Sequence, residues 1–228
     1  ASPEALQQLR DVAIKTNKKL AEKLGINQST AVTCVKPSGT VSQLVDAASG
    51  IHARHHPHYV RTVRGDNKDP LTMFLKDKGI PSEPDFTAPD NVTVFSFPMK
   101  SPEGAVTRYD MSALAQLELW LKIADNYCEH KPSVTISVKE NEWLEVGAWC
   151  WEHFDSLSGI SFLPFSDHSY KQAPYQDIDK EAFKELTEKM PAAIDWYELQ
   201  DYEKEDTTTG SQELACAGGV CEIVDIGA

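Results

Sequence analysis

The sequence predicts an α/β fold built on a mostly parallel sheet or a segment of a barrel. Five short β-type runs alternate with helical patterns between residues 31 and 163, an order that places helices between parallel strands. The 228 residues, 41% hydrophobic and 25% charged, suffice for one large domain or two small ones. This composition excludes collagen-like, low-complexity and wholly disordered chains.

The first predicted element is a helix over residues 2–24. Ser2 can act as its N-cap, Pro3 suits the first turn, and Gly25 is placed to end it. Its apolar residues recur at the spacing of one helix face: Leu6, Leu9, Val12, Ala13, Leu20 and Leu24. The run AVTCVK at 31–36 then predicts a strand, followed by a short helix that ends near Ala48.

The remaining helices and strands are predicted from the alternation of apolar and polar residues, from helix-capping residues and from Gly and Pro residues that end an element. The pattern predicts strands at 58–64, 91–98, 133–138 and 160–163, and helices at 69–79, 111–129, 141–154 and 180–189. The run HYVRTVR at 58–64 alternates as a strand does, and Asp69-Pro70 opens a helix that Gly79 closes. Residues 171–175, KQAPY, are predicted to form a loop.

The C-terminal part differs in charge from the rest. Residues 191–228 hold nine acidic residues and one lysine, whereas residues 1–190 have the composition of a folded domain. We therefore predict a first domain over 1–190 and an acidic segment over 191–228, whose last part, 205–228, is a flexible tail.

Charge and cysteine content narrow the class of protein. The formal net charge of −13 disfavours binding to a nucleic-acid polymer, and no apolar run reaches the ~20 residues of a membrane span. No signal-peptide pattern is visible, and five cysteines do not form a secreted disulfide framework. A cytoplasmic protein is the expectation.

A candidate phosphate site lies at 37–42, the residues Pro37, Ser38, Gly39, Thr40, Val41 and Ser42. Here a strand-type run ends, small residues form a turn and a helix is expected to begin. The N–H groups at a helix start and the hydroxyls of Ser38 and Thr40 can bind phosphate oxygens, and Gly39 lets a ligand approach the backbone. The alternative is an ordinary turn whose Ser or Thr caps the helix.

A candidate redox pair lies in the tail. Cys216 and Cys221 flank the Gly218-Gly219 hinge, so a disulfide between them is feasible and can exchange with other thiols. The alternatives are an incidental pair or half of a zinc site, although the tail supplies no further zinc ligands.

A run of four histidines within seven residues, His52, His55, His56 and His58, has two interpretations. It suggests a metal site, but no Cys or carboxylate lies within it and Pro57 interrupts it. A polar loop that lines a site for an anionic ligand, with Arg54 and Arg61 nearby, fits as well. Cys34, Cys128 and Cys150 are expected to be buried small apolar residues, and no metal site is predicted.

Several segments together resemble class II ribonucleotide reductase of the ribonucleoside-triphosphate reductase type. They are TCVKPSGTVSQL (33–44), SGIHARHHPHYVRTVR (49–64), DPL (69–71), FSFPMK (95–100), PSVTISVKENE (132–142), SGISFLPF (158–165), YKQAP (170–174) and GSQELACAGGVCEI (210–223). Each segment is weak alone, but the combination covers nearly the whole chain.

The resemblance implies the second half of a ten-stranded α/β barrel with a flexible C-terminal tail. It implies that residues 37–42 hold the substrate phosphates and that Cys216 and Cys221 re-reduce the active site, with a thioredoxin-like reductant in turn reducing them. Its cofactor is adenosylcobalamin, and its chemistry converts ribonucleoside triphosphates to deoxyribonucleotides through a thiyl radical.

The chain departs from this family in one respect. The family's loop motif, in which an Asn, the radical Cys and a Glu lie close together, is absent, so an N-terminal half must supply it. The chain alone is expected to be inactive. Two other functions stay open: a non-catalytic phosphate- or nucleotide-binding module, and a thiol-redox protein that uses only the tail cysteines.

Overall fold

The computed structural model describes residues 1–38, 41–165 and 171–204. Contacts divide the chain into two compact units: residues 1–59 with 100–169, and residues 60–99 with 170–228. The division predicted after residue 190 is not tested by this partition and stays a prediction. None of the helices in the described ranges is long and apolar enough to cross a membrane.

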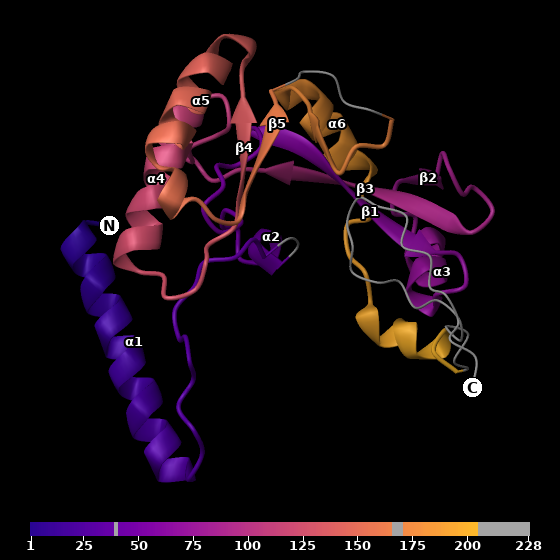
Figure 1. The fold of residues 1–228 in the computed structure, drawn as a ribbon. Helices are drawn as coiled ribbons and strands as arrows, with labels where there is room; N and C mark the ends of the chain where they lie inside the picture. The colour runs from indigo at the N-terminus through magenta and orange to yellow at the C-terminus, as the bar shows by residue number, and fades with distance from the viewer. Residues whose placement is uncertain (39–40, 166–170, 205–228) are drawn as a thin grey trace, which may run out of the picture. The chain divides into compact units, whose positions relative to one another are not determined.

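The first unit is built from helices around a two-stranded sheet (Figure 1). Its helices are α1 (Pro3–Leu24), α2 (Val41–Leu44), α4 (Ala113–Asn126) and α5 (Trp143–Glu152), its strands β4 (Val134–Val138) and β5 (Ile160–Pro164), and its 3-10 turns η1 (Glu140–Glu142) and η2 (Phe154–Ser156). β4 and β5 are parallel and in register from Val134 opposite Ile160 to Val138 opposite Pro164. The chain between them contains α5, as the predicted alternation requires.

The core of this unit lies between the sheet and α4. β4 alternates buried and half-buried residues, and Ile136 and Val138 are fully buried together with Leu117 and Trp120 of α4. Trp120 donates its indole N–H to the Pro132 carbonyl over 3.3 Å, so its one polar atom is satisfied inside the core. Ser112 caps α4 by accepting from the Ala115 amide.

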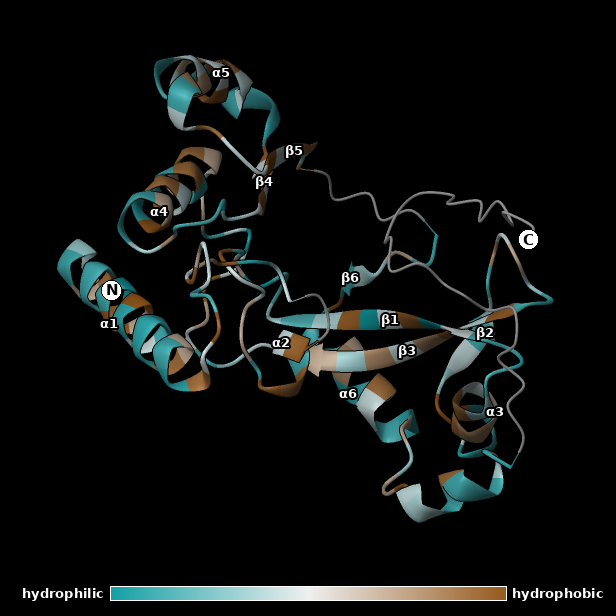
Figure 2. Ribbon diagram, turned by 60° about the horizontal axis from the view of Figure 1, so that its bottom comes forward, coloured by the Kyte–Doolittle hydropathy of each residue, from teal (hydrophilic) through white to brown (hydrophobic). Residues whose placement is uncertain are grey.

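The long first helix is confirmed with its predicted caps. Ser2 accepts from the Ala5 amide, and Gly25 ends α1 with a left-handed φ of 65°. Near its start Gln7 donates to the Asn126 side chain at the end of α4. Most of α1 is hydrophilic, as its teal colour in Figure 2 shows. Its apolar residues Leu9, Val12, Leu20 and Leu24 are exposed.

The second unit is organised around a four-stranded sheet in the order β2-β3-β1-β6. The strands are β1 (His58–Asp66), β2 (Ser82–Pro84), β3 (Val92–Lys100) and β6 (Tyr175–Asp177), and the helices are α3 (Pro70–Asp77), α6 (Lys180–Lys189) and the 3-10 helix η3 (Trp196–Asp201). β2 pairs antiparallel with β3. Phe74 of α3 is fully buried, and its ring packs against those of Trp196 and Tyr202.

Most predicted helices and strands are confirmed, but the prediction of a strand at 31–36 is wrong. Its amides and carbonyls bind a loop instead of a strand: Thr33 O accepts from the amides of Glu129 and His130, and the Glu129 carboxylate accepts from the amides of Val32 and Thr33. The helix expected to reach Ala48 ends at Leu44. Two three-residue strands, β2 and β6, are additional to the prediction.

The barrel half is not confirmed as predicted. The fold is α/β, but the six strands of the described residues form one four-stranded and one two-stranded sheet, and neither is closed. The predicted tail at 205–228 lies outside the described residues.

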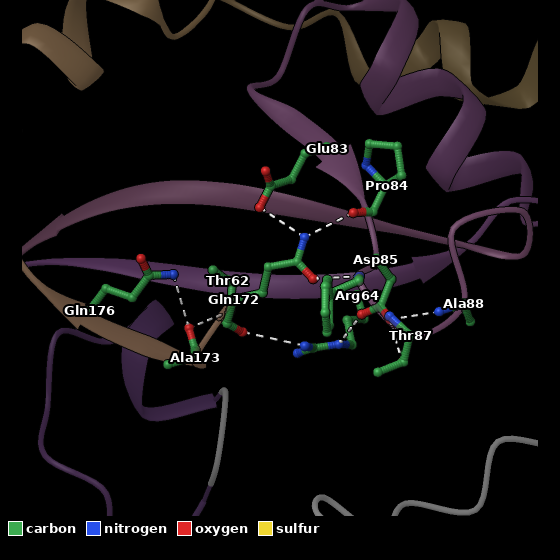
Figure 3. A network of polar contacts seen from close by, with 11 residues as sticks. Thr62, Arg64, Glu83, Pro84, Asp85, Thr87, Ala88, Gln172, Ala173 and Gln176 are labelled. Carbon is green, nitrogen blue, oxygen red and sulfur yellow. Dashed lines mark hydrogen bonds and ion pairs between the residues drawn. The ribbon is translucent and has the colours of Figure 1, made fainter. Parts of the chain in front are cut away.

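A buried polar network fixes the segment after residue 170 onto the second unit (Figure 3). Gln172 donates to the Glu83 carboxylate and the Pro84 carbonyl, each over 2.8 Å, and accepts from the Phe86 amide. Asp85, beside it, binds the Arg64 guanidinium at 2.8 Å. The KQAP segment is thus held by hydrogen bonds at the edge of the sheet.

Asp85 makes this unit sensitive to acid. Its hydrogen bond from the Thr87 hydroxyl, followed by those from the Thr87 amide, Arg64 and the Ala88 amide, lowers its pKa from 3.8 to about 2, against burial, which raises it. Because the folded-state pKa lies below the unfolded value, this stabilisation is present above about pH 4 and is lost as the pH falls towards 2.

Asp85→Asn is therefore expected to lower the free energy of unfolding at pH 7 by an amount on the order of 2 kcal/mol, and this deficit is expected to shrink towards pH 2. Urea unfolding across this pH range measures it, with the exposed Asp90→Asn as the matched control. A deficit equal at pH 7 and at pH 2 would contradict the assignment.

Candidate functional site

The predicted phosphate segment lies in the first unit, immediately before and within α2. Pro37 and Ser38 are exposed and irregular in structure, and Val41 and Ser42 open α2. Gly39 and Thr40 lie outside the described residues. The Ser38 amide donates to the Ser49 hydroxyl over 3.0 Å, and the Val41 amide donates to Ser38 O over 3.4 Å.

Ser42 has an unusual environment for a serine. It is 5% exposed, and its hydroxyl has no hydrogen-bond partner in the part of the chain that the structure describes. Leaving a buried hydroxyl unpaired costs about 1–3 kcal/mol, so such groups often mark a place where a ligand or water binds. A hydroxyl can donate to a phosphate oxygen, which makes Ser42 the strongest candidate within the segment.

α2 is a single turn and is held from outside by two side chains. Tyr59, 1% exposed, donates its hydroxyl to the Gln43 carboxamide over 2.5 Å. Arg54, also buried, donates to the Ala47 carbonyl at 2.6 Å and forms an ion pair of 2.9 Å with Asp46. These contacts fix the chain directly after the candidate site.

The same contacts show which groups the Arg54 guanidinium binds. Its guanidinium binds Asp46 and the Ala47 carbonyl, and its Nε donates to Ser101, so its charge is neutralised inside the unit. Arg61 lies in the second unit, where it donates to the Pro174 carbonyl and stacks 4.5 Å from the Tyr175 ring. The contacts of Arg54 therefore direct its guanidinium to protein groups of the first unit.

The histidines of the run make contacts with other protein groups. His52 bonds the backbone of Ser49 and Thr135, His56 bonds the His58 carbonyl, and His55 packs edge-on against Tyr59. Across the described residues, no group of three or more His, Cys, Asp or Glu is placed to hold a metal ion.

The cysteines of the described residues do not form a redox centre. Cys34, Cys128 and Cys150 are half-buried and reduced. Burial raises the pKa of the Cys128 and Cys150 thiols, which makes them poor nucleophiles at neutral pH. The predicted redox pair, Cys216 and Cys221, lies outside the described residues.

The sequence placed His52 in a candidate polar loop but gave no partners for it, for Ser49 or for Tyr59. Ser49, His52 and Tyr59 connect the candidate site to the rest of the unit, yet their partners lie up to 83 residues away in the sequence. The local signals were the histidine run and the Ser49-Gly50 pair, which marks a turn.

Comparison with known proteins gives a consistent result. No protein-family profile matches the chain. An adenosylcobalamin-dependent ribonucleoside-triphosphate reductase of Lactobacillus delbrueckii subsp. bulgaricus is 27% identical over 96% of this chain and 30% of its own length. The Euglena gracilis protein of the same name is 32% identical over 81% of this chain and 26% of its own length.

A solved structure agrees with these relatives. The crystal structure of a B12-dependent class II ribonucleotide reductase matches 88% of this chain with a TM-score of 0.72 and 25% identity, and the match covers 28% of that protein. The chain therefore spans about 30% of the length of the curated relatives that it matches.

Proposed function

This chain is a homologue of class II ribonucleotide reductases, and we propose that it forms the C-terminal portion of such an enzyme. In the proposal it contributes part of the catalytic barrel, the substrate-phosphate segment at 37–42 and the tail dithiol. An N-terminal portion supplies the radical cysteine. The complete enzyme converts ribonucleoside triphosphates to deoxyribonucleotides.

The observation that carries the phosphate proposal is the buried Ser42 hydroxyl, which has no hydrogen-bond partner among the described residues. α2 is too short for its dipole to attract an anion strongly, so the hydroxyls and the backbone of the turn must provide the binding. Tyr59 and Arg54 fix the chain after Ser42, which supports a preset position for the Ser42 hydroxyl before substrate binds.

The proposed role of the tail depends on thiol–disulfide exchange by its two cysteines. Cys216 and Cys221 have Gly218-Gly219 between them, and glycines relax the backbone, so formation of a disulfide between the two thiols is feasible. Their oxidation delivers two electrons and two protons to the active-site disulfide of the complete enzyme, and a thioredoxin-like dithiol restores them by exchange.

The proposed cofactor, adenosylcobalamin, supplies the radical chemistry when it is bound in the complete enzyme. The two hollows described in the first unit do not fit it. Two hollows of the first unit, of about 210 and 260 Å³, are far smaller than a corrin ring with its side chains. We therefore assign no cofactor contact to this chain and derive no step through the cofactor.

The test is reconstitution. This chain, joined to the N-terminal portion that the proposal requires, is expected to form deoxyribonucleotide from a ribonucleoside triphosphate, adenosylcobalamin and a small dithiol, and Gly39→Val is expected to abolish the reaction. Diphosphate substrates in a parallel assay define the phosphate specificity. Stable association of the portions without any turnover would refute the proposal and favour a binding module.

A further inference from the structure

A turn formed by residues 49–52 joins the candidate phosphate segment to β4 through three hydrogen bonds in series. The Ser38 amide donates to the Ser49 hydroxyl over 3.0 Å. His52 Nδ1 and the Ser49 carbonyl are 2.8 Å apart. The Thr135 amide of β4 then donates to His52 Nε2 over 3.0 Å. A single side chain thus connects the sheet to the turn that holds Ser38.

The partners of His52 select one form of its ring. A backbone amide can only donate, so Nε2 must accept from Thr135, and a carbonyl can only accept, so Nδ1 must carry the proton towards Ser49. Both bonds are satisfied together only by the neutral ring with its proton on Nδ1. His52 therefore donates one hydrogen bond and accepts the other, and both bonds require the same tautomer.

The turn also packs against the phosphate segment directly. Gly50 has a φ of 61°, and a Cβ placed on it would lie 3.0 Å from the Lys36 carbonyl oxygen and 3.3 Å from the Pro37 nitrogen. The next residue, Ile51, is 5% exposed and belongs to the core cluster with Trp120. The turn is anchored in the core on one side and touches the start of the phosphate segment on the other.

We propose that His52 is a positioning residue for the substrate phosphates, acting through Ser49 on Ser38. This inference rests on the proposed function of residues 37–42. It gives the histidine run a purpose other than metal binding: the first of its four members helps to fix Ser38 through Ser49. Losing that connection is expected to weaken substrate binding while leaving the chemical step unchanged.

The test uses the complete reductase and measures KM and kcat for a ribonucleoside triphosphate. His52→Phe keeps a ring of similar size but removes both bonds, and it is expected to raise KM about tenfold with kcat within about twofold. His52→Gln can still accept from the Thr135 amide and is expected to recover part of the loss. His130→Phe, at an exposed histidine of the same unit, is the control and is expected to change neither constant.

A double-mutant cycle tests the route of the effect. Ser49→Ala removes the acceptor of the Ser38 amide and leaves the His52–Thr135 bond in place. If the three bonds act in series, Ser49→Ala raises KM on its own, and adding His52→Phe raises it little further. Hydrogen exchange at the Ser38 amide is expected to quicken in both variants, and at the Thr135 amide only in His52→Phe.

Two outcomes would overturn the inference. In the first, His52→Phe lowers kcat and thermal stability together but leaves KM unchanged, which is the behaviour of a general packing residue. In the second, the two KM effects multiply as independent sites do. The proposed function is tested separately by Ser42→Ala, and an unchanged KM in this variant would contradict it. A raised KM in Ser42→Ala together with a normal KM in His52→Phe would reject only the role of His52.

Discussion

Replacing both Cys216 and Cys221 with serine will abolish turnover of the complete reductase when a thioredoxin-like protein is the reductant, while a small dithiol will still support turnover. The reason is that the two reductants differ in their access to the active-site disulfide. A protein donor must pass its electrons through thiols that can leave the active site, whereas a small dithiol can enter it and reduce the disulfide directly.

The measurement compares deoxyribonucleotide formation with the two reductants for the wild type and the double variant. Each single variant, Cys216→Ser and Cys221→Ser, should behave like the double variant, because one thiol cannot complete the exchange. Cys150→Ser, at a half-buried cysteine that the proposal does not use, is the control and should keep both activities. Full activity of the double variant with the protein reductant would refute the role of the tail.

Ser42→Ala should raise KM for a ribonucleoside triphosphate roughly ten- to hundredfold. A hydrogen bond to a charged group contributes about 1.5–3 kcal/mol, and the Ser42 hydroxyl has no other described partner to compensate its burial. In the absence of substrate the same change should leave stability unchanged or slightly higher, because it removes an unpaired buried polar atom.

Steady-state kinetics and thermal unfolding together check this prediction. Ser29→Ala, at an exposed serine after α1, is the matched control and should leave KM unchanged. A variant that loses stability but binds substrate normally would show that the Ser42 hydroxyl serves the fold and would exclude it from the phosphate site.

The helices were predictable because their signals are local. Ser2 and Ser112 cap the helices that follow them, Asp69 precedes Pro70 at the start of α3, and Gly25 ends α1. Strands depend on partners elsewhere in the chain. Residues 31–36 have strand-like composition, but Glu129 and its neighbours occupy their backbone groups.

The candidate site was predictable in its residue types but not in its supports. The small residues and hydroxyls at 37–42 suggest phosphate binding because hydroxyls and free backbone N–H groups can donate to phosphate oxygens. Nothing near His52 in the sequence indicates that its partner is the amide of Thr135, 83 residues later. The isolation of the Ser42 hydroxyl is likewise a property of the packed structure.

The parallel pair β4 and β5 has a consequence for handling the protein. Within the described residues β5 pairs with β4 alone, and Ser161 and Leu163 on it are exposed. A strand with one open side is a template for another strand, and parallel sheets in proteins are normally covered on both faces. Produced alone, this chain should therefore tend to self-associate and precipitate through β5, and co-expression with the proposed N-terminal portion should keep it dispersed.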